Sequence, residues 1–322
     1  MKKCLKITLN ILVFVIIAGF GYYMVRTMMS DDKTFFSGGS NTENGFVSPY
    51  KKTYSLKVAS DILCFDIVEN TIYIAQSDKV SVYDLSGKLQ RDFVIKKDVR
   101  DMVVEDSRIY LLYPAEIEVL TLEGEKVAGW EARRNNSDYC SMALSSEYIF
   151  VTDAANKHIC KYTKEGEYLA IILSPHGFII PSYSFGIVNI GDTIYCSNSG
   201  RHKIESYTLE GQYIASFGKS GTEAGSFAGC CNPVYLAATQ HGDIITSEKG
   251  NPRISCYSRT GEFRGILLNS KKLGGGNQAY RVKVQDDKIY VAGKKSLSVF
   301  VFDTELAAQS TCAGCPANCP LK

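Results

Sequence analysis

The chain has 322 residues, of which 45% are hydrophobic and 22% charged, and its 36 Lys and Arg nearly balance its 34 Asp and Glu to leave a net charge of +2. This balance excludes attraction to nucleic acid through bulk charge, so we expect no nucleic-acid partner. The sequence has four histidines and no G-x-S-x-G, H-E-x-x-H or phosphate-loop motif, which excludes the enzyme classes that those motifs mark.

The first element in chain order is an apolar segment from Ile7 to Val25 that carries no charge. About 19 helical residues at 1.5 Å each nearly cross a hydrocarbon layer of roughly 30 Å. We predict an uncleaved transmembrane anchor over residues 1–27, with a cleaved signal peptide as the alternative. The N-terminal flank of this segment is positive, with Lys2, Lys3 and Lys6. This charge predicts that the N-terminus is inside and the rest of the chain outside the cytoplasmic membrane, which is the periplasm if the cell is Gram-negative.

A β-rich unit then repeats six times, and each unit contains an aliphatic residue followed by an aromatic or aliphatic one. These pairs are Ile72-Tyr73, Ile109-Tyr110, Ile149-Phe150, Ile194-Tyr195, Ile244-Ile245 and Ile289-Tyr290. Their spacings of 37, 40, 45, 50 and 45 residues are typical of propeller blades. We therefore predict an all-β, six-bladed β-propeller over residues 51–305. Residues 28–50 are rich in Ser, Gly, Asn and Thr, and we predict a flexible tether there. Residues 306–322 form a tail after the propeller.

Within the units, a polar residue before glycine separates two alternating runs and predicts a hairpin. These dipeptides are Ser86-Gly87, Glu123-Gly124, Glu165-Gly166, Glu210-Gly211 and Thr260-Gly261. The predicted blades cover residues 60–98, 99–138, 139–182, 183–231, 232–277 and 278–305. The sixth unit is one strand short, so we expect residues 54–59 to complete it and close the ring.

The fifth unit resembles the NHL-repeat signature of six-bladed propellers. The resemblance lies in Phe217–Phe227, Asn232-Pro233, Gly242–Ser247 and Arg253–Tyr257, and the third unit matches in part. It implies the propeller fold over residues 60–305, and it implies a binding scaffold more often than an enzyme.

The eleven cysteines fall into groups with different expected states. Four lie in β runs of a chain large enough not to need disulfides, and we expect buried free thiols there; these are Cys64, Cys160, Cys196 and Cys256.

The C-terminal tail has the spacing C-x2-C-x3-C-P at Cys312, Cys315 and Cys319. This spacing resembles the last three ligands of a bacterial ferredoxin-type motif, but Gln309 stands where the first ligand would fall. The tail thus indicates an incomplete iron–sulfur or soft-metal site for Zn²⁺ or Cu⁺. Thiol redox or attachment chemistry, and a disordered tail whose cysteines pair with one another, are the alternatives.

Cys230 and Cys231 form a second cluster, between glycine and proline, in a predicted loop at the end of the ring. They are candidate metal ligands that can complete the tail site, and the alternatives are a vicinal disulfide or a space-filling role. Glu248, Lys249 and Arg253 are expected near the same rim, where Glu248 and Lys249 are alternatively solvated turn residues.

Three functions follow from these features. The first is a membrane-tethered extracytoplasmic scaffold with a metal or iron–sulfur site, accessory to a redox or metal-handling complex and bound to a membrane-associated protein partner. The second is a propeller that recognises a protein, peptide or glycan without metal. The third is a propeller lyase or lactonase.

Overall fold

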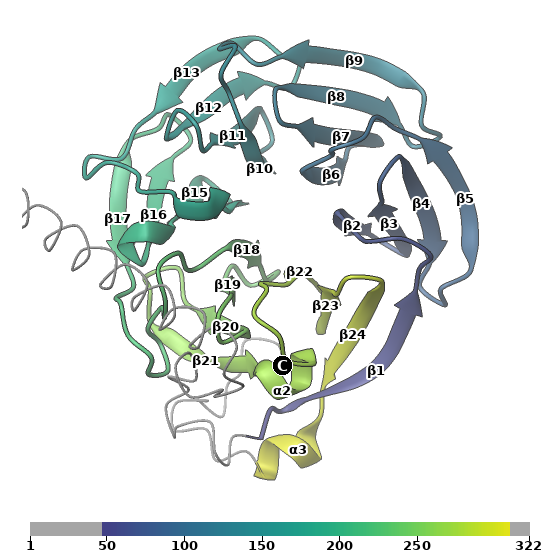
Figure 1. Ribbon diagram of the computed structural model, residues 1–322. Helices are drawn as coiled ribbons and strands as arrows, with labels where there is room; N and C mark the ends of the chain where they lie inside the picture. Colours follow the sequence, from purple (N-terminus) through teal and green to yellow (C-terminus); the bar gives the residue numbers. More distant parts are fainter. Residues whose placement is uncertain (1–46, 310–322) are drawn as a thin grey trace, which may run out of the picture. The chain divides into compact units, whose positions relative to one another are not determined.

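The computed structural model describes residues 47–309, which form six four-stranded antiparallel sheets arranged as the blades of a propeller (Figure 1). Blade 1 contains β2 (Cys64–Val68), β3 (Thr71–Ala75), β4 (Lys79–Asp84) and β5 (Leu89–Val94), and blade 2 contains β6 (Asp101–Glu105), β7 (Arg108–Tyr113), β8 (Glu116–Thr121) and β9 (Lys126–Glu131). Blade 3 contains β10 (Tyr139–Leu144), β11 (Tyr148–Asp153), β12 (His158–Thr163) and β13 (Tyr168–Ile172), and blade 4 contains β14 (Ile187–Ile190), β15 (Thr193–Asn198), β16 (Lys203–Thr208) and β17 (Tyr213–Phe217). Blade 5 contains β18 (Tyr235–Ala238), β19 (Ile244–Glu248), β20 (Arg253–Tyr257) and β21 (Phe263–Leu268), and blade 6 contains β22 (Arg281–Gln285), β23 (Lys288–Ala292), β24 (Ser296–Phe302) and β1 (Tyr50–Lys57). The predicted six-bladed architecture is confirmed.

The ring closes through β1, the first strand in the chain, which becomes the outermost strand of blade 6. It pairs antiparallel with β24 from Tyr50 opposite Phe302 to Lys57 opposite Ser296. The closing strand predicted at residues 54–59 is confirmed, although it starts four residues earlier than expected. The added length matters because the Tyr50 side chain is fully buried and packs edge-on against the Phe302 ring, with 5.7 Å between centroids.

The hydrophobic core consists of layers between neighbouring blades, and this arrangement explains the repeated residue pairs. In blade 2, Ile109 packs toward blade 1 while Tyr110 packs toward blade 3. The pair Ile149-Phe150 divides in the same way between the layers on either side of blade 3. Adjacent residues of a strand point to opposite faces, and both faces of a blade are covered, so each blade needs two large apolar residues in sequence.

The predicted hairpin glycines join the third and fourth strands of five blades, and all have positive φ. Each also lies against a side chain of the preceding blade. A Cβ added at Gly166, where φ is +93°, would lie 2.5 Å from the Trp130 ring on β9. Glycine is required there by the backbone conformation and by the close approach of the two blades.

We expect Gly166→Ala to lower the free energy of unfolding by about 2–4 kcal/mol, because it combines a left-handed backbone with overpacking against Trp130. Gly191→Ala is the matched control, since Gly191 also has positive φ (+61°) but no atom lies within 4 Å of an added Cβ. Urea unfolding followed by circular dichroism would measure both. Equal losses for the two variants would show that the contact between blades does not constrain this glycine.

The described residues contain two short α-helices, α2 (Ser270–Leu273) and α3 (Thr304–Gln309), and two 3-10 helices, η2 (Pro181–Tyr183) and η3 (Ser199–Arg201). Over residues 47–309, none of these helices has the length and apolar character needed to span a bilayer. The anchor predicted at residues 1–27 and most of the tether lie outside the described residues.

Candidate functional site

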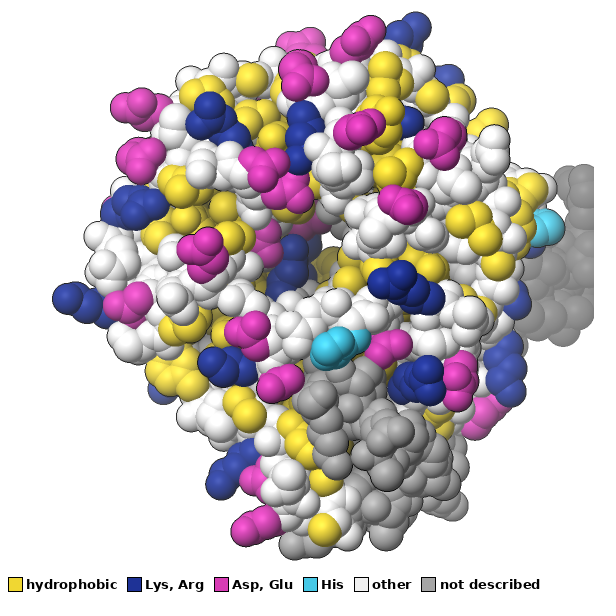
Figure 2. Space-filling model, turned by 180° about the vertical axis from the view of Figure 1, so that it is seen from behind, with side chains coloured by type: hydrophobic (Ala, Val, Ile, Leu, Met, Phe, Trp, Pro, Cys, Tyr) yellow, Lys and Arg dark blue, Asp and Glu magenta, His cyan; other side chains and the backbone are white. Residues whose placement is uncertain are grey.

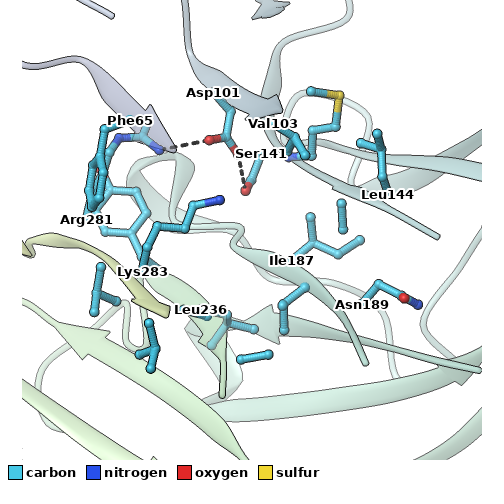
Figure 3. A pocket seen from close by; sticks show the side chains of 18 residues that line it. Phe65, Asp101, Val103, Ser141, Leu144, Ile187, Asn189, Leu236, Arg281 and Lys283 are labelled. Atoms are coloured by element: carbon cyan, nitrogen blue, oxygen red, sulfur yellow. Dashed lines mark hydrogen bonds and ion pairs between the residues drawn. The ribbon is translucent and has the colours of Figure 1, made fainter. Parts of the chain in front are cut away.

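The first strand of each blade faces a central channel, and these six strands contact one another in ring order (Figure 1). A cavity of about 250 Å³ lies in the channel, and eighteen residues drawn from all six inner strands line it (Figure 3). From behind, the central opening shows basic and acidic side chains inside it (Figure 2). The channel is therefore a hollow with apolar walls and a charged region.

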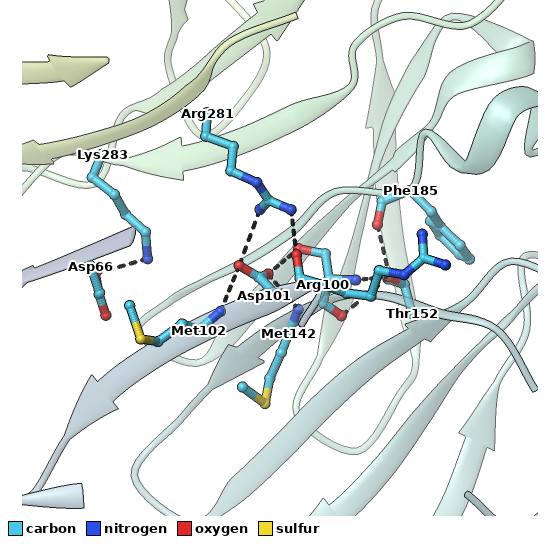
Figure 4. Close-up of polar contacts among 10 residues, drawn as sticks. Asp66, Arg100, Asp101, Met102, Met142, Thr152, Phe185, Arg281 and Lys283 are labelled. Carbon is cyan, nitrogen blue, oxygen red and sulfur yellow. Dashed lines mark hydrogen bonds and ion pairs between the residues drawn. The ribbon is translucent and has the colours of Figure 1, made fainter. Parts of the chain in front are cut away.

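The charged region consists of two ion pairs that join blade 6 to blades 1 and 2 (Figure 4). Arg281 and Lys283 are two residues apart on β22, so strand alternation points both toward the channel. The Arg281 guanidinium lies 3.3 Å from Asp101 of β6, and the Lys283 ammonium lies 3.0 Å from Asp66 of β2. The two cations and two carboxylates make the cluster neutral overall.

Both carboxylates are held by backbone groups as well as by the cations. Asp101 accepts hydrogen bonds from the Met102 and Met142 backbone N–H groups, each at 3.0 Å, and from the Ser141 hydroxyl at 2.8 Å. Asp66 accepts a bond of 2.8 Å from the Val104 backbone N–H on the next blade. Each acid thus links its own inner strand to two other inner strands, and its position is determined by the fold.

The two cations stay protonated in spite of burial. Burial lowers the pKa of Lys283, but the Asp66 and Asp101 carboxylates more than compensate and raise it above its usual value. Burial likewise lowers the pKa of Arg281, but Tyr235 and Asp101 raise it more, so the net shift is upward. The Arg281 guanidinium lies 4.7 Å from the centroid of the Tyr235 ring. About a third of the Lys283 side chain is exposed, so its ammonium can donate to a ligand in the channel as well as to Asp66.

A second candidate site lies in the loop between β17 and β18, where Cys230 is exposed and Cys231 is buried. Their Sγ atoms are 3.2 Å apart. Burial raises the pKa of Cys231, but hydrogen bonds from Lys249, Cys230 and Ser182 lower it more, so the net shift is downward. The Cys231 thiolate in turn raises the pKa of Cys230. The two thiols therefore titrate as a pair rather than independently.

Polar contacts with blade 5 hold this loop in place. The Asn232 amide donates to the Lys249 carbonyl at 2.8 Å, and its oxygen accepts from the Lys249 backbone N–H at 2.9 Å. Arg253 donates to the Ser226 carbonyl and to the Glu248 carboxylate, the latter at 2.8 Å. Because Glu248 and Arg253 are 1% and 2% exposed, the expectation that Glu248 is a solvated turn residue is wrong.

The predicted site residues have different outcomes. Cys230 and Cys231 lie in a loop, as expected, and their sulfurs come together. The ligands predicted in the tail, Cys312, Cys315 and Cys319, lie outside the described residues. The four strand cysteines are buried, which confirms the burial predicted for Cys64, Cys160, Cys196 and Cys256.

The charged channel residues were not singled out from the sequence. The sequence did contain a signal for them, because each of the first three units has a short polar residue in its first strand. These residues are Asp66, Asp101 and Ser141. The alternating Arg281 and Lys283 occupy the first strand of the last unit. Only the ring arrangement shows that these strands face one another.

The chain matches no family model and no curated protein, so its resemblance to NHL repeats remains a prediction from the residues. It is similar in fold to solved propellers. A streptogramin B lyase structure aligns with a TM-score of 0.58 and 15% identity over 80% of this chain and 99% of that one. Virginiamycin B lyase from Staphylococcus aureus aligns with a TM-score of 0.54 and 14% identity over 78% of this chain and 99% of that one. The computationally designed protein Ika8 aligns with a TM-score of 0.53 and 11% identity, also over 78% of this chain and 99% of that one. At these identities the likeness establishes the β-propeller scaffold alone.

Proposed function

We propose that this chain is a membrane-tethered, extracytoplasmic binding scaffold with a soft-metal site, accessory to a membrane-associated redox or metal-handling complex. Cys230 and Cys231 supply two ligands, and the tail thiols complete the site; these are Cys312, Cys315 and Cys319. The observation that carries the proposal is the 3.2 Å separation of the Cys230 and Cys231 sulfurs beside Lys249.

The chemistry of the pair favours a soft cation. Two thiolates bound to one tetrahedral ion at about 2.3 Å are about 3.8 Å apart, so the Sγ atoms need to move little. Lys249 lowers the pKa of Cys231 and so favours the ionised sulfur that a metal requires. Cys319 is ten residues beyond Gln309, and ten residues reach up to about 35 Å. We infer that the tail supplies the remaining ligands to an ion or an iron–sulfur cluster.

Metal analysis of anaerobically purified full-length protein tests this site. We expect bound Zn²⁺, Cu⁺ or iron with acid-labile sulfide, and we expect Cys231→Ser and Cys315→Ser each to remove at least half of it. Cys140→Ser is the matched control because Cys140 is half-buried on β10, away from this loop. Metal-free wild type after anaerobic reconstitution would refute the site, whereas loss in Cys315→Ser alone would confine it to the tail.

The membrane tether rests on the uncharged segment from Ile7 to Val25 and its lysine-rich N-terminal flank. Protease added to intact spheroplasts should digest the propeller, because this orientation leaves it outside the membrane. Protection until lysis would reverse the orientation. Recovery of a soluble form lacking the first residues would instead favour a cleaved signal peptide.

Recognition of a partner without metal is the second candidate function, and the channel favours it. The Asp66–Lys283 and Asp101–Arg281 pairs provide both charges at a neutral site, which suits a polar, uncharged group of a protein, peptide or glycan. If Lys283→Met weakens crosslinking to membrane neighbours while Cys231→Ser leaves it unchanged, this second function is supported. The fold shared with two lyases is compatible with a lyase or lactonase. At 14–15% identity, however, a shared fold is not evidence that this chain has their activity.

A further inference from the structure

A group of three buried side chains in blade 3 combines a carboxylate, an imidazole and a thiol. Asp153 ends β11 and faces His158, the first residue of β12, and Cys160 follows two residues later on the same side of the strand. These three side chains have one possible metal-binding atom each, and the atoms all lie within 4.8 Å of one another. Their residues are 0%, 3% and 3% exposed. Such a donor set is unusual in a buried place because each group is polar.

The other blades show what these positions normally do. In blade 5 the same register places Glu248 opposite Arg253, and the two form a direct ion pair of 2.8 Å. In blade 4, Asn198 occupies the position of Asp153, and its amide donates to Glu205 at 2.8 Å. Direct polar contacts therefore satisfy the buried groups at these positions in blades 4 and 5.

In blade 3 the two facing side chains do not bond to each other, and the Asp153 carboxylate instead accepts hydrogen bonds from Asn156 and from the Asp138 backbone N–H. His158 Nε2 lies 3.9 Å from Asp153 Oδ2, beyond hydrogen-bond distance. Burial raises the pKa of Asp153, but hydrogen bonds from Asn156 and Ser137 lower it more, so the carboxyl is ionised. Burial lowers the pKa of His158, so its ring is neutral and has a single N–H. The His158 ring also hydrogen-bonds to the Asn156 backbone, and its Nε2 atom faces the Asp153 carboxylate within the same buried space.

We propose that Asp153, His158 and Cys160 bind a divalent transition-metal ion of the Zn²⁺ class. Donor atoms around such an ion are about 3.3–3.8 Å apart, so the present spacing needs only a small contraction. Binding displaces the Cys160 proton to solvent, after which one carboxylate and one thiolate balance the double charge of the ion. The backbone contact of the His158 ring then fixes the orientation of the ligand, as second-shell hydrogen bonds do in metal sites.

Metal binding at this site should strengthen with pH, because the Cys160 thiol must lose its proton. The ion binds the thiolate form of Cys160, so each ion bound releases one proton, and a fall in pH opposes binding.

The test uses the full-length protein in which Cys230, Cys231 and the three tail cysteines are replaced by serine, so that the outcome is independent of the function proposed above. After EDTA treatment, titration with Co²⁺ should give one bound ion, visible d–d bands and a thiolate-to-cobalt charge-transfer band. Zn²⁺ should abolish these bands and raise the Tm. His158→Asn and Cys160→Ser should each remove the bands, and His241→Asn, an exposed-site control, should keep them.

A variant that copies the blade 5 residues guards against misfolding. Asp153→Glu, His158→Arg and Cys160→Ser together reproduce the Glu248, Arg253 and Ser255 arrangement, which the fold already accommodates. This variant should fold without metal, and its Tm should not respond to Zn²⁺. Cobalt bands that persist in it, or a starting protein that takes up no Co²⁺ at pH 8, would overturn the proposal.

Discussion

A chain that begins at Ser60, and so lacks β1, should unfold at a far lower urea concentration than a chain that begins at Val47. Both chains retain the other three strands of blade 6, but the shorter one loses the pairing of Tyr50–Lys57 with β24. It also loses the burial of Tyr50 (0% exposed) and Leu56 (7% exposed). These two side chains alone account for about 3–6 kcal/mol at typical burial energies, against a total stability of roughly 5–15 kcal/mol.

The missing strand has a second consequence, because it exposes the edge of β24 and the side chains that β1 covers. The Tyr54 hydroxyl donates to the Ser86 carbonyl at 3.1 Å, so β1 also links blade 6 to blade 1. An unpaired edge in an open ring invites pairing with other chains, and we expect the shorter chain to form aggregates on size-exclusion chromatography. Equal urea midpoints and a monomeric elution for both chains would contradict this role of β1.

The blades could be predicted from the sequence because their determinants are local. Each unit has one residue pair that serves two core layers, as Ile109 and Tyr110 do, and most have a glycine that closes a hairpin, as Gly166 does. The closing strand followed from a count, since the last unit lacked one strand. Buried cysteines such as Cys196 followed from their place in alternating runs.

The sites were harder to predict because they depend on residues from different units. Asp66, Asp101 and Lys283 meet only after the ring closes, and no local pattern indicates which inner-strand residues become neighbours. The burial of Glu248 depends on Arg253, whose head group reaches back to the Ser226 carbonyl of the preceding loop. A charged residue before a turn normally faces solvent, and this long-range contact reverses that rule.

The ion pair between Glu248 and Arg253 should dominate the stability of blade 5 and of the loop that carries Cys230 and Cys231. We expect Arg253→Met to lower the free energy of unfolding by about 3–5 kcal/mol, because it leaves a buried carboxylate without its cation. The double variant Arg253→Met with Glu248→Leu should recover much of this loss, since it removes both charges. Urea unfolding of the two single variants, the double variant and wild type would give the coupling energy.

The pH dependence of the same variant distinguishes a lost charge partner from lost packing. Burial raises the pKa of Glu248 above the usual 4.5 even in the intact protein, where Arg253 opposes the shift. Without Arg253 the folded-state pKa rises further, so the folded variant keeps a proton that the unfolded chain gives up above pH 4.5. The stability deficit of Arg253→Met relative to wild type should therefore be smaller at pH 5 and grow as the pH rises to 7. Alkylation of Cys230 in this variant should become faster over the same pH range as the loop loosens. A stability deficit that is equal at pH 5 and pH 7 would mean that the Arg253 side chain stabilises blade 5 by packing rather than by charge.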